Sequence, residues 1–376
     1  MPVRVGVIGG GQLARMMVPT AIELGIDIRV LAEVEGSSAA IAATAVGDYT
    51  DAATVLAFAR EVDVITFDHE HVPQTVLAAL VDAGHVVHPG PAALAVAQDK
   101  IVMRERLTAI GAPVPDWAVV HDAAGLMTFL GSHGGRAVVK TPRGGYDGKG
   151  VRVVHAAGDA DDWFAAAQAS GDGGLLVEEL VDFRRELAQL VARRPSGEVR
   201  AWPLVETVQR DGVCAEVFAP APRAGSLPGE ARALAERIAT ELGVTGVLAV
   251  ELFETSDGRL LINELAMRPH NTGHWTIDGA VTSQFEQHLR AVLDLPLGDP
   301  SSTAPWSVMV NVLGGPADGT MLDRYQLAMA AHPHAKFHSY GKPSRPGRKV
   351  GHVTVTGADL DDTAAHARAA AGFFQN

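Results

Sequence analysis

The chain has 376 residues, of which 47% are hydrophobic and 20% are charged, and its formal net charge is −13. This length allows two or three domains with a large core, and the acidic balance argues against nonspecific nucleic-acid binding and against an anionic membrane surface. The single cysteine, Cys214, excludes an intrachain disulfide and fits a reducing compartment. Because no apolar run reaches membrane-spanning length and the N-terminus lacks the features of a signal peptide, we expect a cytoplasmic protein without membrane or nucleic-acid partners.

Strands alternate with helices in the first part of the chain. Strands are predicted at 3–8, 26–31 and 62–67, with helices at 12–24 and 51–60. This alternation predicts a parallel α/β sheet. His69 and Glu70 follow the third strand, at the end where open α/β sheets bind ligands. A single helix from about Ala92 to Ile110 then leads to the hinge at 111–115.

The glycine-rich turn after the first strand supports one reading of function. Residues 9–14 match the dinucleotide-binding pattern G-x-G-x-x-A, and Glu33 falls near the position of a ribose-binding acid. This pattern favours an NAD(P)-dependent oxidoreductase. The same kind of turn also holds other phosphates or simply packs tightly, so the alternatives stay open on this pattern alone.

A smaller mixed unit is predicted from residue 113 to about 181, with strands at 136–140, 151–155 and 175–179 and a helix at 159–170. Its loop at 144–150 has four glycines, which let the backbone close over phosphate oxygens, while Lys149 and Lys140 add positive charge. The alternative is a flexible hairpin tip. Residues 178–181 end a strand, a position that suits their backbone groups to pairing with a nucleobase edge. Glu186 is a candidate to hold a ribose.

A hairpin of apolar strands carries two carboxylates. A turn at 255–258 that pairs residue 254 with 259 would put Glu251 opposite Ile262, with Glu264 as a diagonal neighbour roughly 7–8 Å away. Two carboxylates and the Asn263 amide among aliphatic residues predict a Mg²⁺ site, since buried carboxylates need a partner. The alternative is two solvated charges on a hairpin edge.

The second half of the chain is predicted to hold a second α/β unit at 184–293 with long antiparallel strands, followed by a remainder at 301–376. In the first of these, Ala231, Leu234, Ile238 and Leu242 mark one face of a helix that Gly243 ends. The remainder has predicted strands at 307–313 and 350–356, a helix at 364–373 and a basic loop at 342–349. That loop holds four of the 31 basic residues and suits phosphate binding, although a solvated loop is the alternative.

Five sequence strings carry a family resemblance, in order along essentially the whole chain: GGGQLARM (9–16), TFDHEHVP (66–73), GGYDGKG (144–150), NELAMRPHNTGHWT (263–276) and RPGRKVGH (345–352). Together they resemble the ATP-grasp family of N5-carboxyaminoimidazole ribonucleotide synthetases, the ATPase subunit of bacterial purine biosynthesis. The resemblance implies an ATP-grasp fold of α/β and α+β type. Its parts would be a Rossmann-like N-terminal domain with a parallel sheet at 1–98, an ATP-grasp region at 99–300 with a mobile lid at 113–181, and a small C-terminal domain at 301–376.

The resemblance also implies an activity. ATP and bicarbonate would give ADP and carboxyphosphate, and the latter would carboxylate 5-aminoimidazole ribonucleotide to N5-carboxyaminoimidazole ribonucleotide in purine biosynthesis. The enzyme would be an ATP-dependent carbon–nitrogen ligase with two Mg²⁺ ions, for which Mn²⁺ can substitute. It would be a homodimer, and its product would pass to N5-carboxyaminoimidazole ribonucleotide mutase.

The family's functional residues map onto this chain by motif. Metal ligands would be Glu251 and Glu264, and catalytic residues would be Tyr146, Asp147, Arg268 and Lys342, with Asp147 taking the amine proton. The ribonucleotide and bicarbonate would contact Gln12, Glu70, His270, Asn271, Lys342, Arg348 and Lys349. ATP would contact Lys100, Lys140, Gly145, Tyr146, Asp147, Gly148, Lys149, Gly150, Val151, Glu178, Glu179, Leu180, Val181, Glu186, Gln209, Asn263 and Glu264.

Three positions depart from the family's usual pattern. Gln209 stands where a nucleotide-contacting His is frequent, Asp68 replaces a common Glu, and His71 replaces a common Asn. These departures put single contacts in question rather than the reaction. A catalytically inactive ATP-binding regulator is a third alternative, but every catalytic position that the resemblance identifies is filled.

Overall fold

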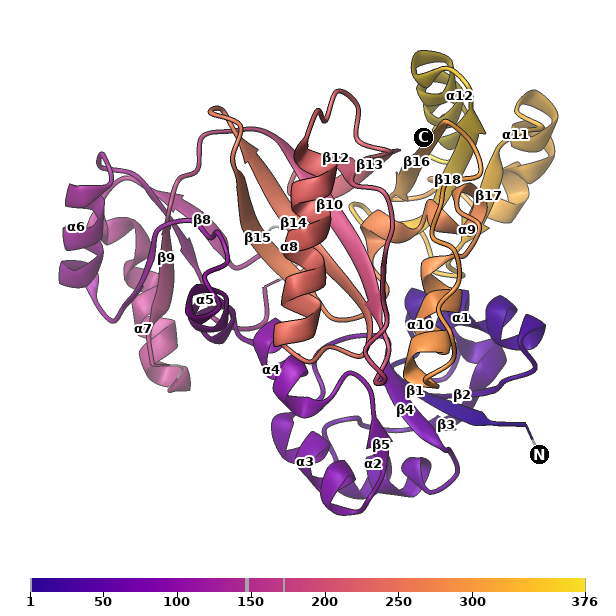
Figure 1. The fold of residues 1–376 in the computed structure, drawn as a ribbon, viewed down its shortest axis with the longest axis horizontal. Coiled ribbons are helices and arrows are strands. Elements are labelled where there is room, and N and C mark those ends of the chain that lie inside the picture. The colour runs from indigo at the N-terminus through magenta and orange to yellow at the C-terminus, as the bar shows by residue number, and fades with distance from the viewer. Residues whose placement is uncertain (1, 146–148, 172, 376) are drawn as a thin grey trace.

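The computed structural model describes residues 2–145, 149–171 and 173–375. The described residues form three β-sheets, which occupy separate parts of the molecule (Figure 1). The N-terminal sheet is at the bottom of that view, a small sheet is at the left, and a large sheet runs from the centre to the upper right. No helix among the described residues is both long enough and apolar enough to cross a membrane.

The N-terminal sheet is parallel and has the strand order β3-β2-β1-β4-β5. Its central strands are apolar and buried, as expected for a parallel sheet with helices on both faces. The predicted strands and helices of this part are confirmed to within a few residues. The elements are β1 Arg4–Ile8, α1 Gln12–Glu23, β2 Asp27–Ala32, β3 Ala43–Val46, α2 Ala52–Ala59, β4 Val64–Phe67, α3 Gln74–Asp82 and β5 Val86–Val87.

The single helix predicted from Ala92 to Ile110 is wrong, because the chain forms two helices there, α4 Pro91–Gln98 and α5 Lys100–Ala109. Asp99 breaks the run with an extended backbone, and its carboxylate accepts hydrogen bonds from the backbone N–H groups of Ile101 and Val102. Asp competes for backbone donors in this way at helix starts. The break matters for the site because Lys100 begins the second helix.

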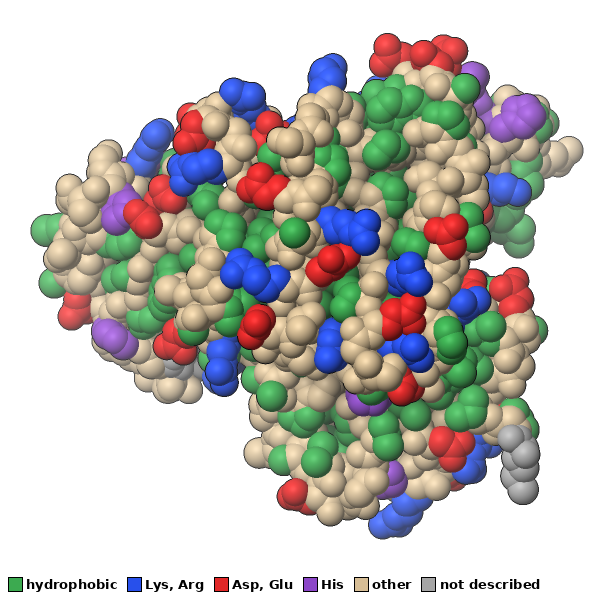
Figure 2. All heavy atoms as spheres, in the orientation of Figure 1, with side chains coloured by type: hydrophobic (Ala, Val, Ile, Leu, Met, Phe, Trp, Pro, Cys, Tyr) green, Lys and Arg blue, Asp and Glu red, His purple; other side chains and the backbone are tan. Residues whose placement is uncertain are grey.

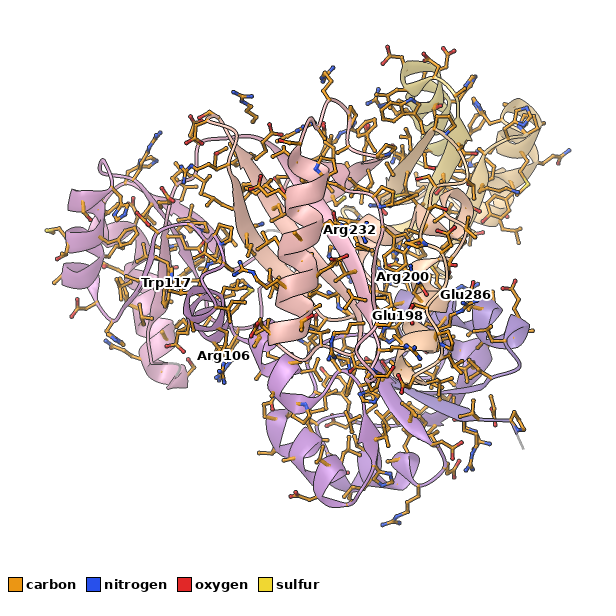
Figure 3. All side chains as sticks on the ribbon, viewed as in Figure 1. Arg106, Trp117, Glu198, Arg200, Arg232 and Glu286 are labelled. Atoms are coloured by element: carbon orange, nitrogen blue, oxygen red, sulfur yellow. The ribbon has the colours of Figure 1, made fainter. Side chains whose placement is uncertain are left out.

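The small sheet is antiparallel, with the order β6-β9-β7-β8, and two helices cover it. Trp117 belongs to this lobe (Figure 3), and its indole N–H donates to Thr108 Oγ1 of α5 at 3.0 Å. This bond ties the lobe to the preceding helix. The elements are β6 Trp117–Val120, α6 Ala123–Ser132, β7 Ala137–Lys140, β8 Val151–Val154, a 3₁₀ turn Ala157–Ala160, α7 Asp161–Ser170 and β9 Leu175–Glu179.

The large sheet has nine strands, of which eight follow the order β15-β14-β10-β12-β13-β16-β18-β17, and β11 pairs with β10. The sheet crosses the domain boundary predicted at residue 300, because β13, before that boundary, pairs with β16, after it. The strands are β10 Phe183–Arg193, β11 Val199–Ala201, β12 Val205–Arg210, β13 Val213–Ala219, β14 Gly246–Thr255, β15 Leu260–Ala266, β16 Trp306–Leu313, β17 Lys336–Ser339 and β18 Lys349–Gly357.

Helices on this sheet bury the apolar faces that the sequence pattern indicates. In α8, Ala231, Leu234 and Ile238 are buried, and Gly243 follows with φ of 62°, a left-handed conformation that favours glycine at a helix end. Figure 2 shows acidic and basic side chains interspersed over the outer surface on this side. The remaining elements are α8 Leu227–Glu241, a 3₁₀ turn Asn271–Gly273, α9 Thr276–Gly279, α10 Gln284–Val292, a 3₁₀ turn Met321–Arg324, α11 Tyr325–Ala331 and α12 Leu360–Gly372; a further 3₁₀ turn, Ala40–Ala42, precedes β3.

Candidate active site

One cavity of about 1600 Å³ lies where the three sheets approach one another, and it collects most of the predicted site residues. Gly150 does not line it, and Tyr146, Asp147 and Gly148 lie outside the described residues. All other predicted site residues line it: Gln12, Glu70, Lys100, Lys140, Gly145, Lys149, Val151, Glu178, Glu179, Leu180, Val181, Glu186, Gln209, Glu251, Asn263, Glu264, Arg268, His270, Asn271, Lys342, Arg348 and Lys349.

Two buried cations share one carboxylate between the small sheet and the large one. Lys140 Nζ is 2.7 Å from Glu178 Oε2 and 3.3 Å from Asn263 Oδ1. Arg104, which is fully buried, bonds the other oxygen of Glu178 and donates to the Asn263 carbonyl at 2.7 Å. Burial lowers the pKa of Lys140, while the Glu178 carboxylate opposes that shift. Two positive groups on one negative group leave a net positive charge, which suits an anionic phosphate.

The two predicted metal ligands face each other directly, so the expected diagonal arrangement is wrong. Glu251 pairs with Glu264, and the next pair is Leu252 with Ile262, which leaves Asn263 as the extra residue of a β-bulge. The turn also closes one residue later than predicted, because Thr255 N donates to the Arg259 carbonyl and residue 254 pairs with 260. A bulge adds one residue to one strand and redirects side chains, and no pattern in the sequence marks its position.

Burial raises the pKa of Glu251 to about 8, and the charges of Glu264 and Glu186 add to this increase. Glu264 has a cation beside it, since Lys100 Nζ lies 3.3 Å from its Oε1. Among the described residues, no group of three or more His, Cys, Asp or Glu side chains is arranged to hold a metal ion alone. A divalent cation fits this pair if phosphate oxygens and water complete its coordination, which is the usual arrangement for Mg²⁺.

Strands of the large sheet give the cavity an aromatic pair and a carboxylate. Phe183 and Phe253 stack with ring centroids 4.6 Å apart, and both line the cavity. Nearby, Gln209 Nε2 donates to Glu186 Oε2 at 3.1 Å. Burial raises the pKa of Glu186, and this hydrogen bond opposes the increase. Aromatic faces with one hydrogen-bonded carboxylate suit a planar base attached to a sugar.

On the opposite wall, Glu70 holds Arg268 rather than pointing freely into the cavity. Its two oxygens accept from Met267 N at 2.7 Å and from Arg268 Nε at 2.8 Å. This ion pair links the segment after β4 to the segment after β15, and it uses the Nε atom of the guanidinium. Asn271, two residues after Pro269, is buried and lines the cavity near the Cys214 thiol.

The basic loop at 342–349 reaches the start of α1. Lys342 Nζ bonds Gln12 Oε1 at the start of α1. Two backbone hydrogen bonds with Gly314 fix the loop. Arg345 N donates to the Gly314 carbonyl at 2.9 Å, and Gly314 N donates to the Arg348 carbonyl at 2.8 Å. A fixed backbone lowers the entropy cost of presenting cations to an anion. Arg345, which the prediction of substrate contacts did not include, lines the cavity as well.

The dinucleotide-like turn is already satisfied by the protein's own carboxylates. Glu33 Oε2 accepts from Gly10 N at 3.0 Å, and Asp68 Oδ1 accepts from Ala14 N at 2.7 Å. A Cβ at Gly11 would lie only 2.0 Å from Asp68 Oδ2, which accounts for glycine at that position. The two carboxyl groups occupy backbone N–H donors that a pyrophosphate would need at this helix start, so this geometry disfavours a nicotinamide cofactor there.

Comparison with known proteins identifies the family. Residues 2–98 match a ribonucleotide synthetase preATP-grasp domain, residues 105–285 an ATP-grasp domain, and residues 307–366 a phosphoribosylaminoimidazole carboxylase C-terminal domain. The N5-carboxyaminoimidazole ribonucleotide synthase of Mycobacterium bovis is 52% identical over 376 residues, which cover 98% of this chain and 86% of the relative. This chain belongs to the N5-carboxyaminoimidazole ribonucleotide synthase family.

Other members agree in sequence and fold. The Corynebacterium ammoniagenes synthase is 52% identical, with 100% of this chain and 92% of the relative covered. The structure of the Aspergillus clavatus synthase with ADP and 5-aminoimidazole ribonucleotide has a TM-score of 0.88 at 32% identity, covering 99% of this chain and 98% of that one. The Thermus thermophilus synthetase has a TM-score of 0.85 at 36% identity, covering 96% of each chain.

The predicted family, fold class and enzyme class are therefore confirmed, and the chain is an ATP-dependent ligase of purine biosynthesis. The oxidoreductase alternative is wrong, because the glycine-rich turn belongs to a preATP-grasp domain. ATP-grasp enzymes generally use divalent metal ions with ATP. Cys214 lines the cavity, but burial raises the pKa of its thiol to about 12, so it is not a reactive thiolate.

Arg104 contacts Glu178 and Asn263 of the site, but no sequence motif predicted it. It lies in α5 among charged neighbours, and charged residues on a helix are usually solvated. Only the tertiary placement of Glu178 and Asn263 makes it a buried partner. Two of the residues that depart from the family pattern have hydrogen bonds in the structure. Asp68 accepts from a backbone N–H at the start of α1, and Gln209 donates to Glu186. His71 lines the cavity and its exposed ring stacks near His69, with centroids 5.3 Å apart.

Proposed function

We propose that this chain uses ATP and bicarbonate to carboxylate 5-aminoimidazole ribonucleotide, and that all three substrates meet in the cavity described above. The observation that carries the proposal is convergence. Residues from five separate sequence strings line one cavity, and both cations and carboxylates are among them. The A. clavatus relative, whose structure contains ADP and 5-aminoimidazole ribonucleotide, supports the same pair of ligands.

The nucleotide would lie between the small sheet and the large sheet. Lys140 and Lys100 would face its phosphates, and Glu186 would accept from its ribose, beside the Phe183–Phe253 wall. Phosphoryl transfer requires mainly positioning and positive charge on the equatorial oxygens, and the shared charge on Lys140 and Arg104 supplies the latter. Glu251 and Glu264 would hold two Mg²⁺ ions, or Mn²⁺ in their place, which neutralise charge on the transferred phosphoryl group.

The ribonucleotide would bind at the opposite wall. Lys342 and Arg348 would hold its phosphate, while Arg268 and Asn271 would contact bicarbonate or the acyl phosphate made from it. Asp147, outside the described residues, would take the proton of the exocyclic amine. We expect Asp147→Asn to retain ATP binding and lose carboxylation, measured by ¹³C-bicarbonate incorporation. Carboxylation at the wild-type rate would remove Asp147 from this role.

Carboxyphosphate leaves an isotopic signature that tests the mechanism. If bicarbonate attacks the γ-phosphoryl group, ¹⁸O from labelled bicarbonate appears in the inorganic phosphate released during turnover. Phosphate without label would mean that water attacks ATP directly, and the proposed mechanism would fail. We further propose a cytoplasmic homodimer whose product passes to N5-carboxyaminoimidazole ribonucleotide mutase, with residues 113–181 acting as a lid over ATP and residues 1–98, 99–300 and 301–376 as its three parts.

A further inference from the structure

His270 contacts one of the two carboxylates proposed to bind metal. Its Nε2 lies 3.3 Å from Glu251 Oε1, and only 14% of the His270 side chain and 26% of the Glu251 side chain are exposed. His270 follows the end of β15, whereas Glu251 is in the middle of β14. The contact therefore links the segment that follows the β14–β15 hairpin to the carboxylate in the middle of β14.

The other ring nitrogen determines which tautomer of His270 is present. His270 precedes the 3₁₀ turn Asn271–Gly273, and its side chain accepts a hydrogen bond from the Thr272 backbone N–H. Thr272 Oγ1 also lies 2.9 Å from Nδ1. Because Nδ1 acts as the acceptor, the ring proton of the neutral imidazole is on Nε2. The protonated Nε2 is then the ring atom next to Glu251, at 3.3 Å from its Oε1.

Gln284 holds the backbone of His270 from both sides. The amide Oε1 accepts from His270 N at 2.8 Å, and the amide Nε2 donates to the His270 carbonyl at 2.8 Å. Gln284 is fully buried at the start of α10, where its own N–H donates to Thr276 Oγ1 at 2.9 Å. A Cβ at Gly273 would lie 2.4 Å from the same Oε1, so glycine at that position makes room for this amide.

We infer that His270 is a positioning residue for Glu251: Thr272 fixes its tautomer, Gln284 fixes its backbone, and its Nε2–H orients the Glu251 carboxylate toward the metal-binding side of the hairpin. This inference rests on the proposed metal role of Glu251 and goes beyond the lining of the substrate pocket. Hydrogen-bond partners of metal ligands fix ligand orientation, and their removal typically lowers metal affinity by about 10-fold to 100-fold.

The experiment measures Mn²⁺ affinity by electron paramagnetic resonance in the presence of ADP, on the full chain. His270→Leu removes the donor, and we expect it to weaken Mn²⁺ binding by about 10-fold to 100-fold. His270→Gln presents an amide N–H near the position of Nε2, so it should keep an affinity close to wild type. Gln284→Leu should weaken Mn²⁺ binding in the same direction as His270→Leu. His133→Leu, at a partly buried histidine outside the cavity, is the matched control and should change nothing.

Three outcomes separate the possibilities. A Mn²⁺ affinity close to wild type in His270→Gln, together with a weakened affinity in His270→Leu, supports the positioning role. Unchanged Mn²⁺ affinity in His270→Leu, or equal losses in the Gln and Leu variants of a folded protein checked by circular dichroism, overturns it. Glu251→Gln tests the underlying metal site in the same assay, because unchanged affinity in that variant would refute the proposed metal role itself rather than the role of His270.

Discussion

Replacing Glu251 with glutamine should make the metal-free protein more stable while removing its activity. In the absence of a cation, burial and then the charges of Glu264 and Glu186 raise the pKa of Glu251 to about 8 from an ordinary value of 4.5. The folded protein therefore resists ionising this carboxyl group. Glutamine keeps the shape and the ability to accept from His270, but it has no charge to repel.

The sign and size follow from proton linkage. Because the folded-state pKa is the higher one, the folded protein binds more protons than the unfolded chain between pH 4.5 and about 8, so the contribution of Glu251 to stability falls as pH rises through that window. Each unit of pKa difference corresponds to about 1.4 kcal/mol, so a pKa raised from 4.5 to about 8 lowers the free energy of unfolding by at most about 5 kcal/mol above pH 8. Since 26% of the side chain is exposed, water screens the repulsion, and we expect about 2–4 kcal/mol.

The assay is urea unfolding of wild type and Glu251→Gln with a chelator present, at pH 5 and at pH 8.5. The variant should gain little at pH 5 and about 2–4 kcal/mol in free energy of unfolding at pH 8.5. Saturating Mg²⁺ and ADP should narrow the gap, because wild type gains binding energy that the variant lacks. ATP cleavage by the variant should be lost.

Two results would refute this reasoning. A gap that does not grow between pH 5 and pH 8.5 would mean that Glu251 is not a strained carboxylate in the folded protein. A variant that cleaves ATP normally at ordinary Mg²⁺ concentrations would mean that the carboxylate is strained for a reason unrelated to metal binding.

Three further substitutions test other walls of the cavity. Lys342→Ala should raise KM for 5-aminoimidazole ribonucleotide far more than KM for ATP, and an equal effect on both would reject its assignment to the ribonucleotide phosphate. Arg104→Met leaves Glu178 with one buried cation instead of two and should cost about 1–3 kcal/mol in urea unfolding, because buried hydrogen bonds to Glu178 and to the Asn263 carbonyl are lost; unchanged stability would show that Arg104 is dispensable. Gln209→Leu removes the hydrogen bond to Glu186 and should raise KM for ATP by about fivefold to tenfold, from about 1 kcal/mol per bond. The same variant should leave KM for 2′,3′-dideoxy-ATP unchanged, and a parallel rise for both nucleotides would contradict a role at the ribose.

Much of the architecture follows from local sequence because its signals are local. The apolar strand at 4–8, the glycines after it and the antiparallel β7–β8 hairpin were predictable from pattern alone. The helix break at Asp99 was not, because its alanine-rich and aliphatic surroundings favour one continuous helix and a single capping carboxylate decides otherwise. The site residues were found through motifs, which name side chains but not their partners.

Contacts between distant segments account for what the sequence could not supply. The bulge that brings Glu251 directly opposite Glu264 adds a single residue to one strand, and the local sequence pattern gives no signal of its position. Arg104 and Gln284 look like ordinary helix residues until the fold buries them against Glu178 and His270. Polar residues of this kind are recognised only when their buried partners are known.

Release of ADP from the purified protein, with ATP, Mg²⁺ and bicarbonate and with or without 5-aminoimidazole ribonucleotide, tests the central claim most directly. We predict slow release without the ribonucleotide and strong stimulation when it is added. Stimulation by a different amine or carboxylate instead would contradict the substrate assignment while leaving the ligase intact. ATP binding without any cleavage would contradict the catalytic proposal and favour an inactive ATP-binding regulator.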